Sequence, residues 1–279
     1  MQHKGPISKF SLHIPSRIDH DPDITQWLMF LSMNCINELY IDNWKLKSIL
    51  KLPNQLFSCD QLTKLTLDLC MLNPPPLFSG FQKLIFIHLN NVSYPSNEAF
   101  RRFVASCPVL EELSIHDDYV SHQLPCLVIN APKLKYLSIS RTFQSVCLNG
   151  SESLLSVSIF LAKLVQNPNK TKTQELIQFL ASACKLEYLC FTRYFIKMLV
   201  AGGVSTILPV TTFTHVTNLR LTALHSWKEL SCVVAIIRSC PNVQKLHISV
   251  NISETSSDVA ENSLMSCNLP DKIFATPLH

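Results

Sequence analysis

The sequence predicts an α/β solenoid in which short parallel strands stack along the whole chain. Three observations indicate this fold class: one hexapeptide pattern recurs nine times, successive copies start 20 to 32 residues apart, and 47% of the 279 residues are hydrophobic. A repeat that cannot bury its own apolar face must stack on its neighbours. We therefore expect one continuous core rather than separate globular domains.

Each hexapeptide reads apolar-x-x-apolar-x-apolar, as in Leu110, Leu113 and Ile115. The spacing of the copies brackets the period of about 20–29 residues that defines leucine-rich repeats. Alternate side chains of a strand point to opposite faces, so the fourth and sixth residues should enter the core. The third, fifth and seventh residues should then face outward on a concave parallel sheet. The nine copies begin at Ile36, Leu62, Leu84, Leu110, Leu134, Leu154, Leu186, Val216 and Val243.

Residues 1–34 precede the first repeat and are predicted to cap the N-terminal end of the solenoid. Residues 7–14 alternate apolar and polar side chains, which indicates a strand. A helix is expected over residues 24–33 after the capping residue Asp23, with one apolar face made by Ile24, Trp27, Leu28 and Leu31.

The return segments between repeats are expected on the convex face and differ in kind. The run Asn73-Pro74-Pro75-Pro76 cannot be helical, because proline lacks the backbone N–H and clashes with the preceding turn. Three other segments have the spacing of amphipathic helices, the first of them capped by Ser96 or Asn97; they are residues 97–106, 173–182 and 227–238.

The repeat pattern fades near residue 250, so the solenoid of about nine repeats is assigned to residues 35–250. Residues 251–279 are predicted to form a poorly ordered tail, because their first half is polar and the rest lacks helical periodicity. Within this tail Leu264 and Met265 are the apolar pair that could cover the last repeat.

Composition and sequence pattern argue against a nucleic-acid partner, a membrane span and a signal peptide. The net charge of +4 is small and dispersed, and no Lys/Arg run exceeds the pair Arg101-Arg102, so no nucleic-acid partner is expected. No stretch reaches the roughly 18 apolar residues of a membrane span. The first six residues lead into no apolar segment of a signal peptide. We therefore expect a cytoplasmic or nuclear protein.

The 11 cysteines are predicted to be reduced, since their number is odd and no group of them has zinc-binding spacing. Cys59, Cys107 and Cys240 each lie three residues before the first residue of a hexapeptide, where the fifth copy has Ala131. A position shared by cysteine and alanine favours a small buried group rather than a redox or metal site.

No pattern of catalytic, cofactor-binding or metal-binding residues stands out, so an enzyme is not expected. His116, Asp117 and Asp118 resemble an acid/base or metal group but follow a repeat strand, where we expect a solvated turn. There is no Gly-x-Ser-x-Gly motif, and the pair Gly202-Gly203 lacks the lysine of a phosphate loop.

The predicted concave face carries aromatic side chains beside small serines in its central strands. Exposed rings with small neighbours are typical of protein-recognition surfaces, although the same rings could simply pack across strands of a solvated sheet. The candidate protein-binding residues are Phe86, His88, Glu112, Tyr136, Tyr188 and Arg220.

Three groups of motifs together resemble one known family. They are residues 3–12 with 24–31, residues 52–67 with Cys70, Pro74-Pro75 and Gly80-Phe81, and the segments 106–113 and 239–246, in which Ser106-Cys107-Pro108 and Ser239-Cys240-Pro241 precede two hexapeptides. In combination, over about residues 3–250, they resemble the leucine-rich-repeat region of plant F-box/LRR proteins, many of which also bear an FBD domain.

The resemblance implies a non-catalytic role in the recognition of substrates by SCF-type ubiquitin ligases. In that family an F-box binds the Skp adaptor and the repeats select the target. Here nothing before Gly5 can be an F-box, and residues 251–279 are shorter than an FBD region, so they are interpreted as a truncated FBD-like segment. Binding of a Skp-type adaptor is therefore doubtful. The alternatives are an F-box-independent scaffold or decoy, or a truncated non-functional fragment.

Overall fold

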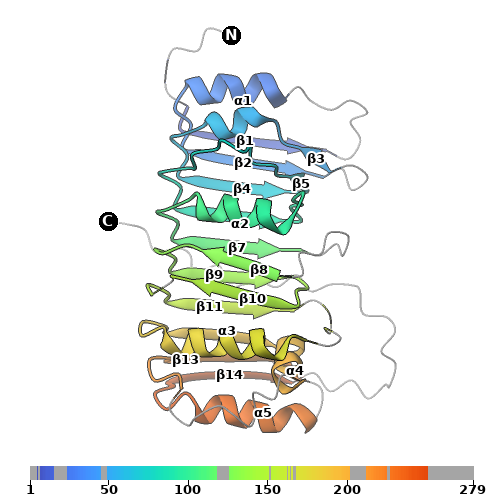
Figure 1. Ribbon diagram of the computed structural model, residues 1–279, viewed down its shortest axis with the longest axis vertical. Coiled ribbons are helices and arrows are strands. Elements are labelled where there is room, and N and C mark those ends of the chain that lie inside the picture. Colours follow the sequence, from blue (N-terminus) through green and yellow to red (C-terminus); the bar gives the residue numbers. More distant parts are fainter. Residues whose placement is uncertain are drawn as a thin grey trace.

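The computed structural model describes residues 5, 7–15, 24–44, 49–117, 126–150, 152–161, 163, 165, 168–201, 212–224 and 227–250. A ten-stranded parallel sheet runs through them in the order β1-β2-β4-β6-β7-β9-β11-β12-β13-β14. Figure 1 shows these strands stacked along the longest axis of the molecule. Their bounds are β1 Lys9–Ile14, β2 Glu38–Asn43, β4 Lys64–Asp68, β6 Phe86–Asn90, β7 Glu112–His116, β9 Tyr136–Ser140, β11 Ser156–Phe160, β12 Tyr188–Thr192, β13 Asn218–Leu224 and β14 Lys245–Val250.

The nine hexapeptides account for nine of the ten strands, and each of these strands begins at the third residue of its hexapeptide. Equivalent positions lie side by side, because Phe86 pairs with Glu112 and Glu112 pairs with Tyr136. The predicted solenoid with a long parallel sheet is thus confirmed. Its strands stay in register because each one has to turn the same two residues into the core.

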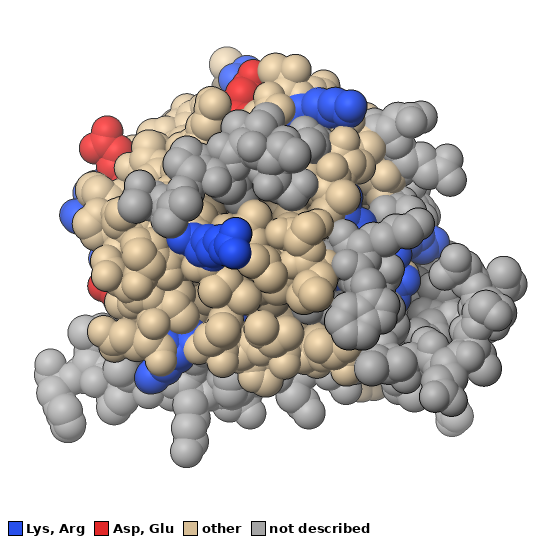
Figure 2. Space-filling view, turned by 90° about the horizontal axis from the view of Figure 1, so that it is seen from below, with Lys and Arg blue, Asp and Glu red and all other residues tan. Residues whose placement is uncertain are grey.

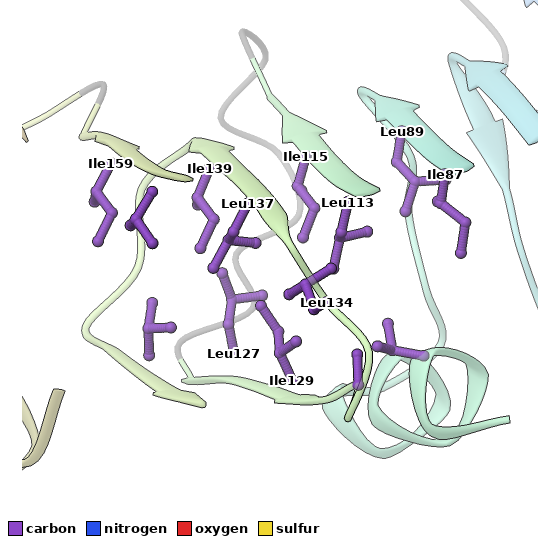
Figure 3. Close-up of a cluster of buried hydrophobic side chains, with 14 of the residues drawn as sticks. Ile87, Leu89, Leu113, Ile115, Leu127, Ile129, Leu134, Leu137, Ile139 and Ile159 are labelled. Carbon is purple, nitrogen blue, oxygen red and sulfur yellow. The ribbon is translucent and has the colours of Figure 1, made fainter. Parts of the chain in front are cut away.

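The core lies on one side of the sheet and runs along the stack. In the first eight hexapeptides, the fourth and sixth residues are only 0–2% exposed. Figure 3 shows Leu113, Ile115, Leu137 and Ile139 pointing from the strands toward residues of a return segment, Leu127 among them. Burial of such side chains is the main favourable contribution to folding, at about 25 cal/mol per Å² of apolar surface.

The N-terminal strand and helix form where they were predicted. β1 pairs with β2, and α1 spans Ile24–Met33. Trp27, placed in the sequence on the apolar face of this helix, is 43% exposed and packs edge-on against Phe10, with ring centroids 5.9 Å apart. The proposed cap Asp23 lies outside the described residues.

Both helical and extended return segments lie behind the sheet. The predicted helices are α2 (Asn97–Ala105), α3 (Lys170–Ser182) and α5 (Trp227–Arg238). Ser96 caps α2 by accepting a hydrogen bond from the Ala99 N–H at 3.1 Å. α3 begins three residues earlier than expected, because Asn169 Oδ1 accepts a hydrogen bond from the Lys172 N–H at 3.0 Å.

Several back elements were not predicted from the sequence. α4 (Arg193–Ala201) follows β12 without a turn signal. The short strands β3 (Leu50–Lys51) and β5 (Cys70–Met71) pair with each other, as do β8 (Cys126–Asn130) and β10 (Ser145–Asn149). A 3-10 helix, η1, covers Asn54–Ser58, and the proline run at 73–76 is non-helical as predicted.

The thiols predicted to be buried are buried. Cys59, Cys107 and Cys240 are 1 to 3% exposed, and Ala131 in the equivalent place is 0% exposed. Burial raises the pKa of the Cys59 and Cys107 thiols to about 12 and that of Cys240 to about 11. All ten cysteines within the described residues are free of disulfide bonds.

Besides Asp23, three further predictions fall outside the described residues: the tail at 251–279, the pair Gly202-Gly203 and the acid Asp118. Among the helices that are described, none has the length and apolar character needed to cross a membrane.

Candidate functional site

The face of the sheet that turns away from the core, here called the open face, carries the third, fifth and seventh residues of each hexapeptide. Strand register aligns these residues in rows across the sheet. The row of third positions runs through Lys9, Glu38, Lys64, Phe86, Glu112, Tyr136, Ser156, Tyr188, Asn218 and Lys245. The six predicted binding residues all lie on this face.

Four of the six candidates form one group, here called the central group. Phe86, Glu112 and Tyr136 occupy adjacent strands in the row of third positions, and His88 lies two residues after Phe86. Tyr136 is 36% exposed and the other three side chains are half-buried. Burial raises the pKa of the Glu112 carboxyl, although nearby Lys64 opposes the shift. Partly covered rings beside a carboxylate can make both apolar and polar contacts with a partner.

The other two candidates form a second group farther along the sheet. Tyr188 and Arg220 lie on neighbouring strands, and the Arg220 side chain hydrogen-bonds to the Tyr188 hydroxyl. Burial, followed by the neighbouring Cys190, raises the pKa of Tyr188 to about 12. The serines of β11 separate this group from the central group, since Ser156 pairs with both Tyr136 and Tyr188. The six residues thus make two patches rather than one.

The small residues at fifth positions are less available than the sequence suggested. Ser114, Ser138 and Ser158 are 7–8% exposed, and Cys190 is 1% exposed, although all four face away from the core. Neighbouring strands lie only about 4.8 Å apart, so the larger third- and seventh-position side chains cover a short one between them. These four side chains therefore lie beneath larger neighbours on the open face and are not accessible to a binding partner.

His116 differs from the prediction of a solvated turn. It is the last residue of β7, is half-buried, and its ring lies 5.2 Å from that of His88. Burial, together with His88, lowers the pKa of His116 to about 4, and burial also lowers the pKa of His88. Asp117 pairs instead with Arg141 at 2.9 Å. His116 is the seventh residue of its hexapeptide, a position that the pattern assigns to the sheet, whereas its polar neighbours Asp117 and Asp118 favoured a turn.

Because the pKa of His116 is lowered to about 4, from about 6.5 in an unfolded chain, folding stability should depend on pH. Below pH of about 6.5 the unfolded chain gains a proton that the folded chain excludes. The contribution is therefore complete above this pH and is lost as the pH falls toward 4. We expect a loss of about 2 kcal/mol, since solvent still reaches part of the ring.

Urea unfolding at about pH 7 and about pH 4.5 would measure the loss due to His116. The variant His116→Gln lacks the titrating ring and should lose distinctly less stability over this interval than the unmodified chain. Equal losses for the two proteins would show that His116 does not contribute to the acid sensitivity.

The sequence reading missed a hollow in the open face near its N-terminal end. The hollow measures about 300 Å³ and is lined chiefly by polar residues of β1, β2 and β4 together with Phe86. At its rim Glu38 lies between two cations, with its carboxylate 3.7 Å from Lys9 Nζ and 3.1 Å from Lys64 Nζ. The alternating polar residues Lys9, Ser11 and His13 are the sequence feature that indicates this polar surface, because they place three polar side chains on one face of β1. The prediction of a capping role for residues 1–34 does not include it.

Two acids lie at seventh positions beside this hollow, Asp42 buried and Asp68 half-buried. Asp42 is 5% exposed, and its Oδ2 accepts hydrogen bonds from His13 Nδ1 and the Tyr40 hydroxyl, each at 3.2 Å. Asp68 is its register neighbour and accepts a hydrogen bond from Asn90 Nδ2 at 2.7 Å. Burial raises the pKa of the Asp68 carboxyl. At this end of the open face the third positions therefore carry Lys9, Glu38 and Lys64, whereas the seventh positions of β2 and β4 carry carboxylates.

The chemistry of the open face is that of non-covalent recognition. Among the described residues no three His, Cys, Asp or Glu side chains are placed to hold a metal ion. The side chains offer aromatic surface, hydroxyl and amide groups, and charges of both signs. Such a mixture suits contact with another protein.

Comparison with known proteins places these features in a family. The family model described as "FBD-associated F-box protein At5g56370, LRR repeats" matches residues 24–248. Among similar Arabidopsis thaliana proteins, F-box/FBD/LRR-repeat protein At1g13570 is 31% identical, with 96% of this chain and 65% of that protein aligned. The putative F-box/FBD/LRR-repeat protein At5g25850 is 26% identical over 82% of this chain and 52% of its own length.

A third relative, F-box/FBD/LRR-repeat protein At1g78750 of Arabidopsis thaliana, is 26% identical over 73% of this chain and 51% of its own length. The chain therefore spans about half to two thirds of the length of these relatives. No solved structure matches the chain.

Proposed function

We propose that this chain, which belongs to the leucine-rich-repeat family of FBD-associated F-box proteins, is a non-catalytic module that binds target proteins through its open face. In this proposal residues 35–250 are the binding solenoid and residues 1–34 its N-terminal cap. The finer role is that of the substrate-recognition region of an SCF-type ubiquitin ligase receptor, acting in the cytoplasm or nucleus.

The observation that carries the proposal is the row of third positions, which no described helix covers. The described parts of the return segments pack on the other side of the sheet, where the core lies, so Phe86, Glu112 and Tyr136 face away from every described helix. Aromatic residues with a partly covered body and an accessible tip are common anchors of protein interfaces. Tyr136 is the most exposed member of the central group and the best single anchor to test.

The variant Tyr136→Ala should weaken target binding without unfolding the chain. Loss of an anchoring ring at an interface costs about 2 kcal/mol or more, which raises the Kd about 30-fold. The measurement is to compare proteins that co-purify with the unmodified chain and with the variant, and then to titrate the recovered target. Tyr136→Phe keeps the ring and should retain most of the affinity.

Circular dichroism melting curves of both variants establish whether the fold is intact. Unchanged affinity of Tyr136→Ala, in a chain that melts like the unmodified one, would remove the central group from the binding surface. The parallel variant Tyr188→Ala tests the second group in the same way.

A second measurement separates a ligase receptor from a scaffold or decoy. Overproduction of the chain in cells should accelerate turnover of a recovered target if the chain delivers it to a ligase. Slower turnover would favour the scaffold or decoy. Pulldown of a Skp-type adaptor tests delivery directly.

A further inference from the structure

The C-terminal end of the stack exposes side chains that belong to the core elsewhere in the chain. Leu246 and Ile248 are the fourth and sixth residues of the ninth hexapeptide and are 46% and 41% exposed. The sixteen equivalent residues of the other eight hexapeptides are 0–2% exposed. The same sequence pattern is therefore buried in eight strands and open in β14, which lies at the edge of the sheet.

The helix that precedes β14 adds to this apolar end. Leu230 and Val234 of α5 are 45% and 36% exposed, and they are spaced four residues apart, so they share one helix face. Among the residues that Figure 2 colours, this end shows mainly uncharged surface with a few scattered basic and acidic side chains. An apolar surface beside an unpaired strand edge is an expected site of association.

The opposite end of the stack shows how such a surface is covered. There β1 pairs with β2, and α1 packs beside it, so Leu39 and Ile41 of the first hexapeptide are 2% and 0% exposed. Terminal repeats of a solenoid need a cap of this kind to stay soluble. Among the described residues nothing equivalent covers β14.

We propose that residues 251–279 of the same chain, which lie outside the described residues, bind this exposed end and cover β14. The segment follows Val250 directly and has 29 residues, within the 20 to 32 that separate successive hexapeptides, so it is long enough to add one further unit. It supplies apolar side chains in its second half, namely Leu264, Met265, Leu269, Ile273 and Phe274.

Charge also favours this occupant. Residues 251–279 contain four acidic residues and one lysine, a net charge of −3, so the other 250 residues hold +7 of a chain whose total is +4. Direct attachment gives the segment an effective concentration in the millimolar range at β14. A second copy of the chain, at micromolar concentration, competes poorly with a segment that is attached directly.

Photo-crosslinking of the full 279-residue chain tests the proposal. With benzoylphenylalanine at position 246, we expect crosslinks to residues 251–279 of the same molecule, identified by peptide mass spectrometry. The same group placed at position 136 on the open face should give none. A crosslinked product of doubled mass, or no crosslink from position 246 to this segment, would overturn the proposal.

Variants within residues 251–279 distinguish specific binding from simple proximity. At least one of the pairs Leu264→Asp/Met265→Asp and Ile273→Asp/Phe274→Asp should reduce the crosslink yield on the order of tenfold, since a charge opposes apolar burial. The control Ser256→Asp/Ser257→Asp adds the same charge in the polar half and should keep the yield. An equal yield from all three variants would refute apolar binding. None of these substitutions alters the described solenoid.

Discussion

Leu113→Asp is expected to break the solenoid at its centre. Leu113 is fully buried, and its register partners Ile87 and Leu137 are 0% and 2% exposed. A carboxylate at this position would lie among apolar side chains without a counter-charge. We expect a loss of at least about 4 kcal/mol, a large share of the roughly 5–15 kcal/mol that holds a domain together.

Because each repeat contacts only its neighbours, the damage should also divide the stack. Chemical denaturation should show a lower midpoint, and hydrogen exchange should show faster exchange in β6, β7 and β9 than in strands farther away. Ile85→Asp introduces the same charge at a side chain that is 40% exposed, and it should cost less than about 1 kcal/mol. Equal effects of the two variants would contradict the assignment of position 113 to the core.

Asp117→Ala is expected to have the next largest effect. Asp117 pairs with Arg141 at 2.9 Å, and the two side chains are 14% and 2% exposed. Removing the carboxylate takes from a buried guanidinium the charge that lies 2.9 Å away, and removal of one partner of a buried ion pair costs about 3–5 kcal/mol. The midpoint of urea unfolding should fall accordingly.

A double variant separates this ion pair from ordinary packing. Replacing both charges, as Asp117→Ala/Arg141→Met, should recover part of the lost stability, because no buried charge is left. The exposed pair Glu98–Arg101, at 2.7 Å with side chains 55% and 50% exposed, is the matched control. Glu98→Ala should leave the unfolding midpoint nearly unchanged. A double variant less stable than either single one would argue against a buried-charge penalty.

Phe86 and Cys190 show which properties of the candidate surface the sequence predicts and which it does not. Alternation along a strand assigns both to the open face, and the structure agrees. Their exposure differs, because Phe86 is half-buried and Cys190 is 1% exposed. Sequence periodicity determines which face a side chain takes, whereas the size of its neighbours on adjacent strands determines whether a partner can reach it.

Side-chain pairing between neighbouring strands was the main omission. Asp117 and Arg141 directly follow the last residues of β7 and β9, two strands that pair with each other, so the strand register brings the two side chains together. Asp42 and His13 are likewise register partners on β2 and β1. The hexapeptide pattern places such residues on adjacent strands but does not show which of them hydrogen-bond or form ion pairs. The short pairs β3–β5 and β8–β10 also depend on contact between successive return segments, whose sequences lack a repeating pattern.

The hexapeptide alone therefore determined the solenoid, the start of every repeat strand and the buried apolar pairs of the first eight copies; the prediction that the ninth pair, Leu246 and Ile248, enters the core was wrong. The repeated pattern of alternating apolar positions could do so because only one strand register turns those eight pairs into the core together. Only the tertiary structure decided which open-face residues are accessible, which charges are paired in the interior, and that β14 is left uncovered among the described residues. Those properties arise between strands, from neighbours that adjoin in space and are separated along the chain.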